Sequence, residues 1–367
     1  MSAVSIVLAG GGTAGHTSPL IATAEALRAR ADVELVCVGT AKGLETRVIP
    51  EAGLRLELIP PVPLPRRLTP ELLAVPSRLW RAVGQARRIL VAHNAQVAVG
   101  FGGYVSLPVY LAARLAKVPL VIHEGNAVPG LANRIAARFT RHVVTTFPET
   151  RLPHARHLGL PVREQIAGLD RVARRPAARA SFGLPDGGPV LLVSGGSQGA
   201  RSLNLATADA VSRLLAAGIS VLHVLGSANL TEDITDVTDA TSGAAYRPVA
   251  YVNDMGDAYA AADLMLGRSG AGTVMETAMT GLPTIFVPLP HGNGEQARNA
   301  GFLIAADAGV LVPDAELDGD RLVTEVSGLL AAPGRLEAMA ATCRRLVPAD
   351  ASAALAQLVL DVAERRD

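Results

Sequence analysis

The chain has 367 residues, enough for two domains that each bury a core of their own. Its residues are 49% hydrophobic and only 3% aromatic, the net charge is +1, and no uncharged apolar run reaches the roughly 18–20 residues that span a bilayer. No basic region precedes a signal-like core at the beginning, so these features argue against a secreted or membrane-spanning protein and favour a soluble, cytoplasmic α/β protein.

Short β-branched runs alternate with helical stretches along the first half of the chain. Cys37 lies in one of the apolar runs and far in sequence from Cys343, so we predict a buried structural thiol rather than a disulfide or metal site. We expect strands at 4–9, 33–38, 55–60, 97–100, 119–122 and 142–146. We expect helices at 19–30, 43–52, 77–92, 105–116 and 129–138.

The second half repeats this alternation. Strands are expected near 190–194, 219–225, 246–250, 263–266, 284–287 and 309–312. Helices are expected near 201–217, 254–261, 272–280, 295–306, 318–331 and 334–346. The alternation predicts an α/β protein of two Rossmann-like, doubly wound parallel-sheet domains, residues 1–160 and 161–349. The Gly- and Pro-containing segment 158–163 suits a hinge, and 350–367 should form a helix that could cross back to the first domain.

Each half opens with an apolar strand, a glycine-rich loop and a helix. In the first half Ser5–Ala9 leads into Gly10–His16, and in the second half Val190–Val193 leads into Ser194–Gly199. Such a turn directs backbone N–H groups and the positive end of a helix at one point, which suits a phosphate or another anion. We therefore expect two nucleotide-binding-type domains that face a cleft, with the ligand chemistry between them.

The first glycine loop matches the pattern G-x-G-x-x-G, which is a weak signal alone. A nicotinamide or flavin site needs an acidic residue about 20 residues further on, at the end of the second strand. Here that strand ends in Gly39 and Thr40, which counts against an oxidoreductase. His16 closes the loop, and its imidazole could serve catalysis or cap the helix; we favour catalysis.

Polar residues follow the strand near 119–122. Asn126 can both donate to and accept from a sugar hydroxyl or an acetamido group. For His123 and Glu124, holding the loop by local hydrogen bonds and direct catalysis remain equally open. Open α/β sheets bind ligands at this carboxyl edge, so the segment belongs to a candidate site.

The run from Gly267 to Glu276 follows an apolar strand and enters a helix. Its backbone amides can cradle a pyrophosphate. The Glu276 carboxylate, one turn inside the helix, can accept hydrogen bonds from both hydroxyls of a ribose, although an acid near a helix N-terminus is also favourable without any ligand. Further along, Gln296 could contact a hexose.

These segments together resemble one family, the bacterial N-acetylglucosamine transferases of glycosyltransferase family 28. The resemblance covers nearly the whole chain and rests on seven runs in order, which are GGGTAGHTSP, GFGGYVSLP, HEGNAVPG, GLPVR, GGSQGAR, GRSGAGTVMETAMTGLP and EQARNA. It implies the GT-B fold and an inverting transfer of N-acetylglucosamine from its UDP donor to the 4-hydroxyl of the muramyl sugar of lipid I. The product would be lipid II, for peptidoglycan synthesis.

The resemblance also implies roles for individual residues. His16 matches a histidine that helps to deprotonate the acceptor, and its ordinary pKa of about 6.5 suits a base near neutral pH. Glu276 would hold the ribose, and Val252 would lie beside the uracil. The other implied donor-binding residues are Thr13, Ala14, Gly15, Asn126, Arg163, Ser197, Ala271, Gly272, Thr273, Val274, Met275 and Gln296.

The resemblance implies no cofactor, and we find no Asp-x-Asp pair placed to hold a catalytic metal ion, so helix dipoles and Arg163 would stabilise the leaving UDP. Departures from the family pattern are few. Ala14 replaces a common glycine, Gly125 stands where glutamine is common, and Glu295 stands where some members have glutamine. Of these, Gly125 affects the expected acceptor contact.

Charge is distributed unevenly. Residues 1–160 carry a net charge of +9 and residues 161–367 a net charge of −8. Between 66 and 88 there are six arginines and one acid, with apolar residues at helical spacing. An apolar, basic helix suits an anionic membrane surface, although solvated arginines above a packed stripe would look the same. The predicted membrane patch comprises Arg66, Arg67, Leu79, Trp80, Arg81, Arg87 and Arg88.

The expected partners are thus UDP-N-acetylglucosamine, lipid I and the anionic inner membrane surface, with other cell-wall synthesis or division proteins as further candidates. The expected location is peripheral, on the cytoplasmic face of the membrane. Alternatives are a UDP-N-acetylglucosamine 2-epimerase, another lipid glycosyltransferase, and a noncatalytic sugar-nucleotide sensor or scaffold. Nucleic-acid binding fits poorly, because the arginines are not interleaved with stacking aromatic residues.

Overall fold

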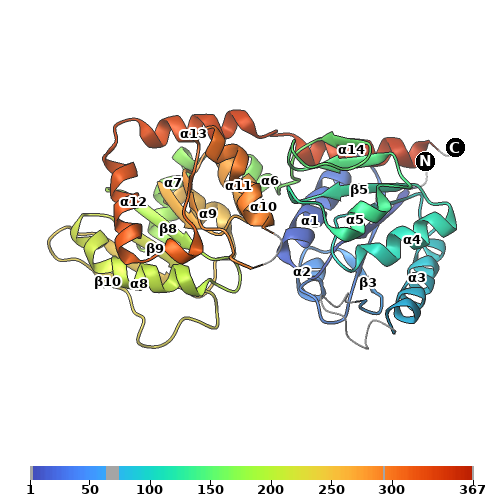
Figure 1. The fold of residues 1–367 in the computed structure, drawn as a ribbon, viewed down its shortest axis with the longest axis horizontal. Coiled ribbons are helices and arrows are strands. Elements are labelled where there is room, and N and C mark those ends of the chain that lie inside the picture. Colours follow the sequence, from blue (N-terminus) through green and yellow to red (C-terminus); the bar gives the residue numbers. More distant parts are fainter. Residues whose placement is uncertain (1–2, 63–73, 292–293, 366–367) are drawn as a thin grey trace. The chain divides into compact units, whose positions relative to one another are not determined.

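A computed structural model describes residues 3–62, 74–291 and 294–365 of the chain. The chain divides into two compact units (Figure 1). Unit 1 comprises Met1–Arg163 together with Asp350–Asp367, and unit 2 comprises Glu164–Ala349. The division falls three residues after the expected boundary, and the C-terminal segment belongs to unit 1.

Unit 1 is built on a parallel sheet with the strand order β3-β2-β1-β4-β5-β6-β7. Its strands are β1 (Val4–Ala9), β2 (Val33–Gly39), β3 (Arg55–Leu58), β4 (Val97–Gly100), β5 (Leu120–Glu124), β6 (His142–Thr145) and β7 (Ala155–His157). Its helices are α1 (Ala14–Arg28), α2 (Glu45–Glu51), α3 (Val75–Ala92), α4 (Ser106–Ala116), α5 (Leu131–Ala136) and α14 (Ala351–Glu364). The central strands are apolar and buried on both faces, as parallel sheets covered by helices require.

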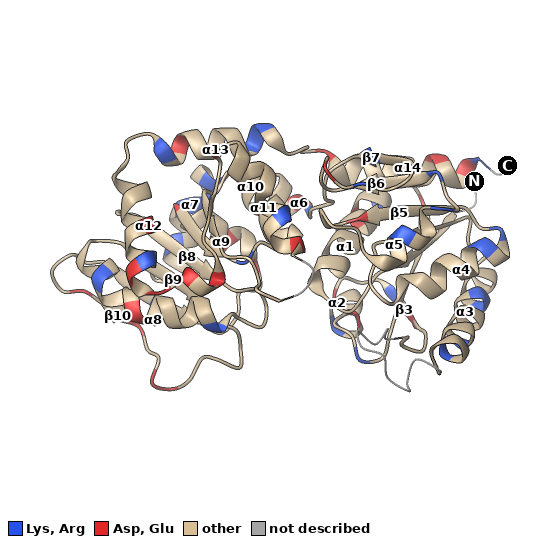
Figure 2. Ribbon diagram, viewed as in Figure 1, with Lys and Arg blue, Asp and Glu red and all other residues tan. Residues whose placement is uncertain are grey.

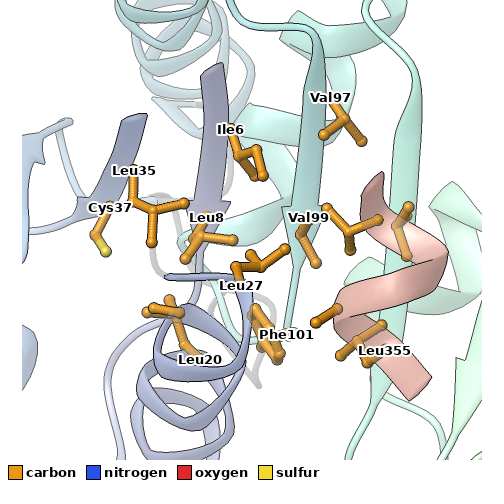
Figure 3. Packing of buried hydrophobic residues seen from close by; sticks show 14 of the residues in the cluster. Ile6, Leu8, Leu20, Leu27, Leu35, Cys37, Val97, Val99, Phe101 and Leu355 are labelled. Carbon is orange, nitrogen blue, oxygen red and sulfur yellow. The ribbon is translucent and has the colours of Figure 1, made fainter. Parts of the chain in front are cut away.

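The core of unit 1 joins the two ends of the chain (Figure 3). Leu20 and Leu27 of α1 and Leu355 of α14 pack on Leu8 and its neighbours in the sheet, and all four are wholly buried. Cys37 belongs to the same cluster, and burial raises the pKa of its thiol to about 12, as expected of a structural cysteine.

The start of α14 is fixed by hydrogen bonds as well as by packing. The Val162 N–H donates to Ser352 Oγ at 3.0 Å, and the same hydroxyl donates to the Val162 carbonyl at 2.8 Å. Arg335–Glu364 is long and apolar enough to cross a membrane by length and composition alone. In the structure this stretch forms two helices, α13 (Arg335–Leu346) and α14, and the apolar side of α14 lies in the core of unit 1.

Unit 2 repeats the design with the strand order β10-β11-β9-β8-β12-β13-β14, in which β10 alone is antiparallel among the described strands. Its strands are β8 (Val190–Ser194), β9 (Ser220–Val224), β10 (Val237–Thr238), β11 (Ala245–Val249), β12 (Leu264–Gly267), β13 (Thr284–Phe286) and β14 (Val310–Leu311). Besides α13, its helices are α6 (Glu164–Ala167), α7 (Arg171–Ser181), α8 (Arg201–Ala216), α9 (Met255–Ala261), α10 (Ala271–Thr280), α11 (Glu295–Ala305) and α12 (Gly319–Ala331). The predicted fold class, two doubly wound parallel-sheet α/β domains, is confirmed.

The structure differs from the sequence-based expectation at several elements. The first helix begins at Ala14 rather than at 19, because the chain turns into the helix directly after Thr13 and accommodates Pro19 inside it. Pro19 removes only one intrahelical N–H donor. Four short or polar elements were not expected, namely α6, α7, β7 and β10.

Candidate active site

Both sheets have a point at which successive strands depart in opposite directions. In unit 1, β1 has β2 on one side and β4 on the other; in unit 2, β8 has β9 on one side and β12 on the other. The loops after β1 and β4, and after β8 and β12, therefore meet at the carboxyl edge of their own sheet. Open α/β sheets bind ligands at such points, and both predicted glycine loops lie there.

His16 stands at the start of α1 in unit 1. Its Nδ1 lies 3.1 Å from Thr13 Oγ1. A β-carbon added to Gly103 would come within 3.3 Å of Nδ1 and 2.8 Å of the Gly11 carbonyl oxygen, so the ring packs closely over the backbone of the loop after β4. Gly103 also has a φ of 80°, which only glycine adopts easily.

Burial lowers the pKa of His16, while a hydrogen bond with the Gly11 backbone and the charge of Glu45 act in the opposite direction. A lowered pKa favours the neutral imidazole. One ring nitrogen of a neutral imidazole donates and the other can accept a proton, and Nδ1 already lies beside Thr13 Oγ1.

Glu124 and His123 at the end of β5 hold the following loop together. The Glu124 carboxylate accepts from the N–H groups of Asn126 and Gly130 and from Asn133 Nδ2, each at 2.9 Å. The His123 side chain is wholly buried, with Nε2 3.0 Å from the Gly159 carbonyl oxygen. These contacts favour loop support over direct catalysis for His123 and Glu124. The Asn126 side chain is half-buried in the same loop.

A cavity of about 650 Å³ opens in unit 2 at the carboxyl ends of β8 and β12. The glycine loop after β8 and the Gly270–Thr273 segment supply its walls, together with Gln296 from α11. Helices α8 and α10 both start here, and neither has a side-chain cap or an acidic residue in its first turn. Uncapped N-termini leave backbone N–H groups for an anion, and the volume suits a small molecule.

Glu276 lies one turn into α10, where the sequence placed it. The Tyr259 hydroxyl, on α9, donates to Glu276 Oε2 at 2.7 Å, and Tyr259 is almost fully buried. Burial and the neighbouring carboxylate raise the pKa of Tyr259 well above its usual range, so it remains a donor. Sequence reasoning missed Tyr259, because only the packing of α9 beside α10 brings it to Glu276.

Arg268 lines the cavity, and the sequence assigned it no role. Its guanidinium donates to Asp314 and, at 3.0 Å, to Ser202 Oγ. It also donates to the Val287 carbonyl at 3.1 Å. Asp314 is drawn in from a turn far along the chain, so this cluster ties the walls of the cavity together.

The other predicted donor residues are distributed unevenly. Ser197 is exposed in the second glycine loop, whereas the side chains of Val274 and Met275 are buried in the core and do not line the cavity. The Gln296 Oε1 accepts from the Leu289 N–H at 2.9 Å, which leaves its amide NH₂ group as the donor. Thr13, Ala14 and Gly15 are exposed at the start of α1. In α10, Ala271 is buried, and Gly272 and Thr273 are half-buried. Val252 is buried in the loop after β11.

Arg163 was expected among the donor-binding residues, and it is the last residue of the first segment of unit 1. Burial raises the pKa of the Glu25 carboxyl on α1, and the charge of Arg163 opposes this rise. Arg163 is thus close enough to α1 for its charge to act on Glu25.

The basic helix predicted at the membrane patch is α3, which contains no acidic residue (Figure 2). Trp80 is 66% exposed, and Arg81, Arg87 and Arg88 are exposed with it. Leu79 instead packs against the buried core under α3, so it does not belong to this surface. The remaining predicted members, Arg66 and Arg67, lie outside the described residues.

Among the described residues, no three His, Cys, Asp or Glu side chains gather closely enough to hold a metal ion.

Comparisons with known proteins place the whole chain. The glycosyltransferase family 28 N-terminal domain matches residues 6–145, and the glycosyltransferase family 28 C-terminal domain matches residues 190–355. A protein of Cutibacterium acnes named UDP-N-acetylglucosamine--N-acetylmuramyl-(pentapeptide) pyrophosphoryl-undecaprenol N-acetylglucosamine transferase is 56% identical over 99% of both chains. A protein of the same name from Nocardioides sp. is 52% identical over 97% of this chain and 98% of its own. The crystal structure of Acinetobacter baumannii MurG matches with a TM-score of 0.78 and 26% identity, over 98% of this chain and 100% of that chain.

Proposed function

The chain belongs to glycosyltransferase family 28, and from this premise we propose how its two units divide the transfer reaction. It is an N-acetylglucosamine transferase of lipid II synthesis with the GT-B fold, as its full-length relatives are named. The donor is UDP-N-acetylglucosamine and the acceptor is lipid I. We propose that unit 2 binds the donor and that unit 1 supplies the base for the acceptor.

The observation that carries this proposal is the cavity of unit 2 between two uncapped helix N-termini. The donor diphosphate would lie against the second glycine loop and the start of α10, where backbone N–H groups converge. The ribose would bind the Glu276 carboxylate, which the Tyr259 hydroxyl holds in place. The amide NH₂ of Gln296 would face the sugar, with Ser197 and Val252 as further donor contacts.

In unit 1, His16 Nε2 would accept the proton of the muramyl 4-hydroxyl as that oxygen attacks the anomeric carbon. The bond to the UDP oxygen breaks on the opposite face, so the configuration inverts and UDP leaves with the electron pair. The exposed Thr13–Gly15 segment and Asn126 would contact the sugars. Arg163 would offset the negative charge of the departing diphosphate.

We propose that this chemistry needs no metal ion, since helix ends and Arg163 carry the charge stabilisation. The matching experiment is transfer with the protein dialysed against EDTA. Full activity after dialysis is the expected result, and restoration only by added Mg²⁺ or Mn²⁺ would contradict it.

Because lipid I is membrane-bound, the enzyme must work at a membrane surface. We propose that the exposed face of α3, Trp80 with Arg81, Arg87 and Arg88, binds anionic lipid on the cytoplasmic side. Each arginine near such a surface contributes about 1 kcal/mol, so Arg87→Gln with Arg88→Gln should weaken vesicle binding by roughly tenfold or more. Arg345→Gln on α13 is the control, and equal binding of all three proteins to phosphatidylglycerol vesicles would contradict the assignment.

The decisive experiment is transfer of radiolabelled N-acetylglucosamine to a short-chain lipid I analogue. His16→Ala should lower kcat by about 10²- to 10⁴-fold and leave UDP binding unchanged. Glu276→Ala should weaken donor binding instead. If wild type binds the donor but makes no disaccharide-lipid, or only epimerises the sugar, the proposed division fails.

A further inference from the structure

A buried carboxylate lies directly beneath the first glycine loop. Glu45, the first residue of α2, is 0% exposed. Its Oε2 accepts from the Gly12 N–H at 2.9 Å, and its Oε1 accepts from the N–H and the hydroxyl of Thr40, both at 2.9 Å. Among the described residues, no Lys or Arg pairs with Glu45, so backbone and hydroxyl donors alone satisfy it.

Three glycines from separate segments make room for this side chain. A β-carbon added to Gly11, Gly39 or Gly43 would come within 2.6, 2.5 or 2.0 Å of a Glu45 side-chain atom. These glycines lie in the loop after β1, at the end of β2 and just before α2. Since Glu45 fills the space that they leave, it joins the first glycine loop to the end of β2.

The contacts keep Glu45 ionised. Burial raises the pKa of its carboxyl, but the hydrogen bonds from Gly12 and Thr40 outweigh burial, and the pKa is lowered overall. A buried anion that holds two backbone N–H groups fixes them more strongly than a neutral acceptor would. The N–H of Gly12, one of the loop donors expected to suit an anion, is therefore already occupied.

The same loop carries His16. Gly11, where an added β-carbon would meet the Glu45 carboxylate, is the residue whose backbone bonds the His16 ring, and Thr13 Oγ1 lies beside Nδ1 of that ring. Two other titratable groups lie on neighbouring loops, Tyr104 after β4 and Glu124 at the end of β5. The Coulombic effect on His16 nevertheless comes from Glu45, which raises the His16 pKa against the effect of burial.

We propose that Glu45 is a positioning residue for the transfer reaction, which fixes the first glycine loop so that His16 is held in place to act as the base. This inference rests on the proposed role of His16. It also changes the reading of the loop: a fixed negative charge beneath it disfavours a diphosphate there, so the loop serves the base and the sugar rather than a phosphate.

The test compares Glu45→Gln with Glu51→Gln, an exposed acid on the same helix, as the matched control. In Glu45→Gln one of the two acceptor oxygens becomes an NH₂ group. In either orientation of the amide, that NH₂ faces the N–H of Gly12 or of Thr40, and two donors cannot bond. We expect kcat to fall about tenfold to a hundredfold, since a small misplacement of a reacting group has that effect, with the donor KM within about twofold. Glu51→Gln should match wild type in both constants.

A second readout does not depend on activity. NMR titration of ¹³C-labelled histidine, with the His16 signal assigned by its loss in His16→Ala, should give a lower His16 pKa in Glu45→Gln than in wild type. The acid limb of the kcat–pH profile should move to lower pH with it, because a base of lower pKa stays unprotonated in more acidic solution.

These measurements distinguish failure of the proposed transferase function from failure of the proposed role of Glu45. If wild type makes no product, the proposed function fails, and the His16 titration still tests whether Glu45 acts on His16. An unchanged His16 titration together with unchanged kcat, or with equal losses in kcat and donor affinity, would overturn the inference.

Should Glu45→Gln fail to fold by circular dichroism, Thr40→Val removes one donor and keeps the charge. It should lower kcat by a smaller factor without moving the His16 pKa, and wild-type kcat in this variant would overturn the inference.

Discussion

The two glycine loops arise from the same sequence pattern but rest on different chemistry. In unit 1 the Gly12 N–H donates to the buried carboxylate of Glu45. In unit 2 no carboxylate accepts from the backbone of loop 195–200 within the part of the chain described, and the loop lines a cavity at two helix ends. The comparison shows that a strand–glycine loop–helix motif presents N–H groups, and that the neighbouring element decides whether a ligand or a side chain receives them.

A glycine substitution in the second glycine loop should have the largest effect. At Gly199, φ is 74° and an added β-carbon would come within 1.8 Å of the Leu225 carbonyl oxygen. Gly199→Ala should therefore destabilise unit 2 by about 3 kcal/mol or more and abolish UDP binding. Gly196→Ala, where φ is 89° and nothing lies within 4 Å, is the control and should lose only about 1–2 kcal/mol.

Calorimetry of UDP binding and guanidinium unfolding would measure both variants. Equal losses of stability in Gly199→Ala and Gly196→Ala would contradict this prediction. They would show that backbone strain alone, and not the packing of the loop against the end of β9, causes the loss.

Low pH should destabilise both units to a similar extent, whereas UDP is expected to bind only unit 2. Burial lowers the pKa of His123 in unit 1 and of His223 in unit 2 to about 4. Between pH 6.5 and 4 these histidines bind protons in the unfolded chain but stay neutral in the folded protein. The free energy of unfolding is therefore highest above pH 6.5 and decreases as the pH falls towards 4. Each histidine accounts for on the order of 3 kcal/mol over that range.

Guanidinium unfolding at pH 7.5 and pH 5 measures this loss. His223→Gln keeps a partner for Asn204 or Tyr246, which bond the two ring nitrogens, and removes the titration. It should reduce the loss for unit 2 and leave unit 1 as in wild type. A loss of unchanged size would assign the acid sensitivity to other groups.

Tyr259→Phe sharpens the comparison at the donor side alone. The change removes the hydrogen bond that orients Glu276, and a hydrogen bond to a charged group contributes about 1.5–3 kcal/mol. We expect the donor KM to rise about tenfold or more, while kcat and the His16 titration stay at wild-type values. A fall in kcat with unchanged KM would place Glu276 in the chemical step.

The smallest expected signal is the response to UDP alone. Hydrogen exchange should slow in loop 195–200 and at the start of α10, because a bound diphosphate would accept from their N–H groups. Residues 10–15 should exchange at the same rate with and without UDP, as the buried Glu45 charge disfavours an anion there. If UDP slowed exchange in both loops, the prediction that only the second glycine loop binds the diphosphate would be wrong.

Much of the fold follows from sequence pattern. The buried strands near Val7 and Val193 are recognisable because parallel strands covered on both faces must be apolar along their whole length. The position of the site is also predictable, since the loops that lead to His16 and Glu276 directly follow such strands, and carboxyl ends of parallel strands share one edge. The polar helix α7 was missed because its arginines look solvated, whereas Arg179 is 3% exposed and donates to the Ala261 carbonyl.

The sequence by itself determined the alternation of strands and helices and the two glycine loops, because these depend on neighbours a few positions apart. Only the tertiary structure decided that Glu45 reaches the Gly12 N–H from 33 residues away and that Tyr259 orients Glu276. It also decided that Leu355 completes the core of unit 1. The physical reason is that a buried polar group must find its partners in three dimensions, and local pattern does not specify which segments meet.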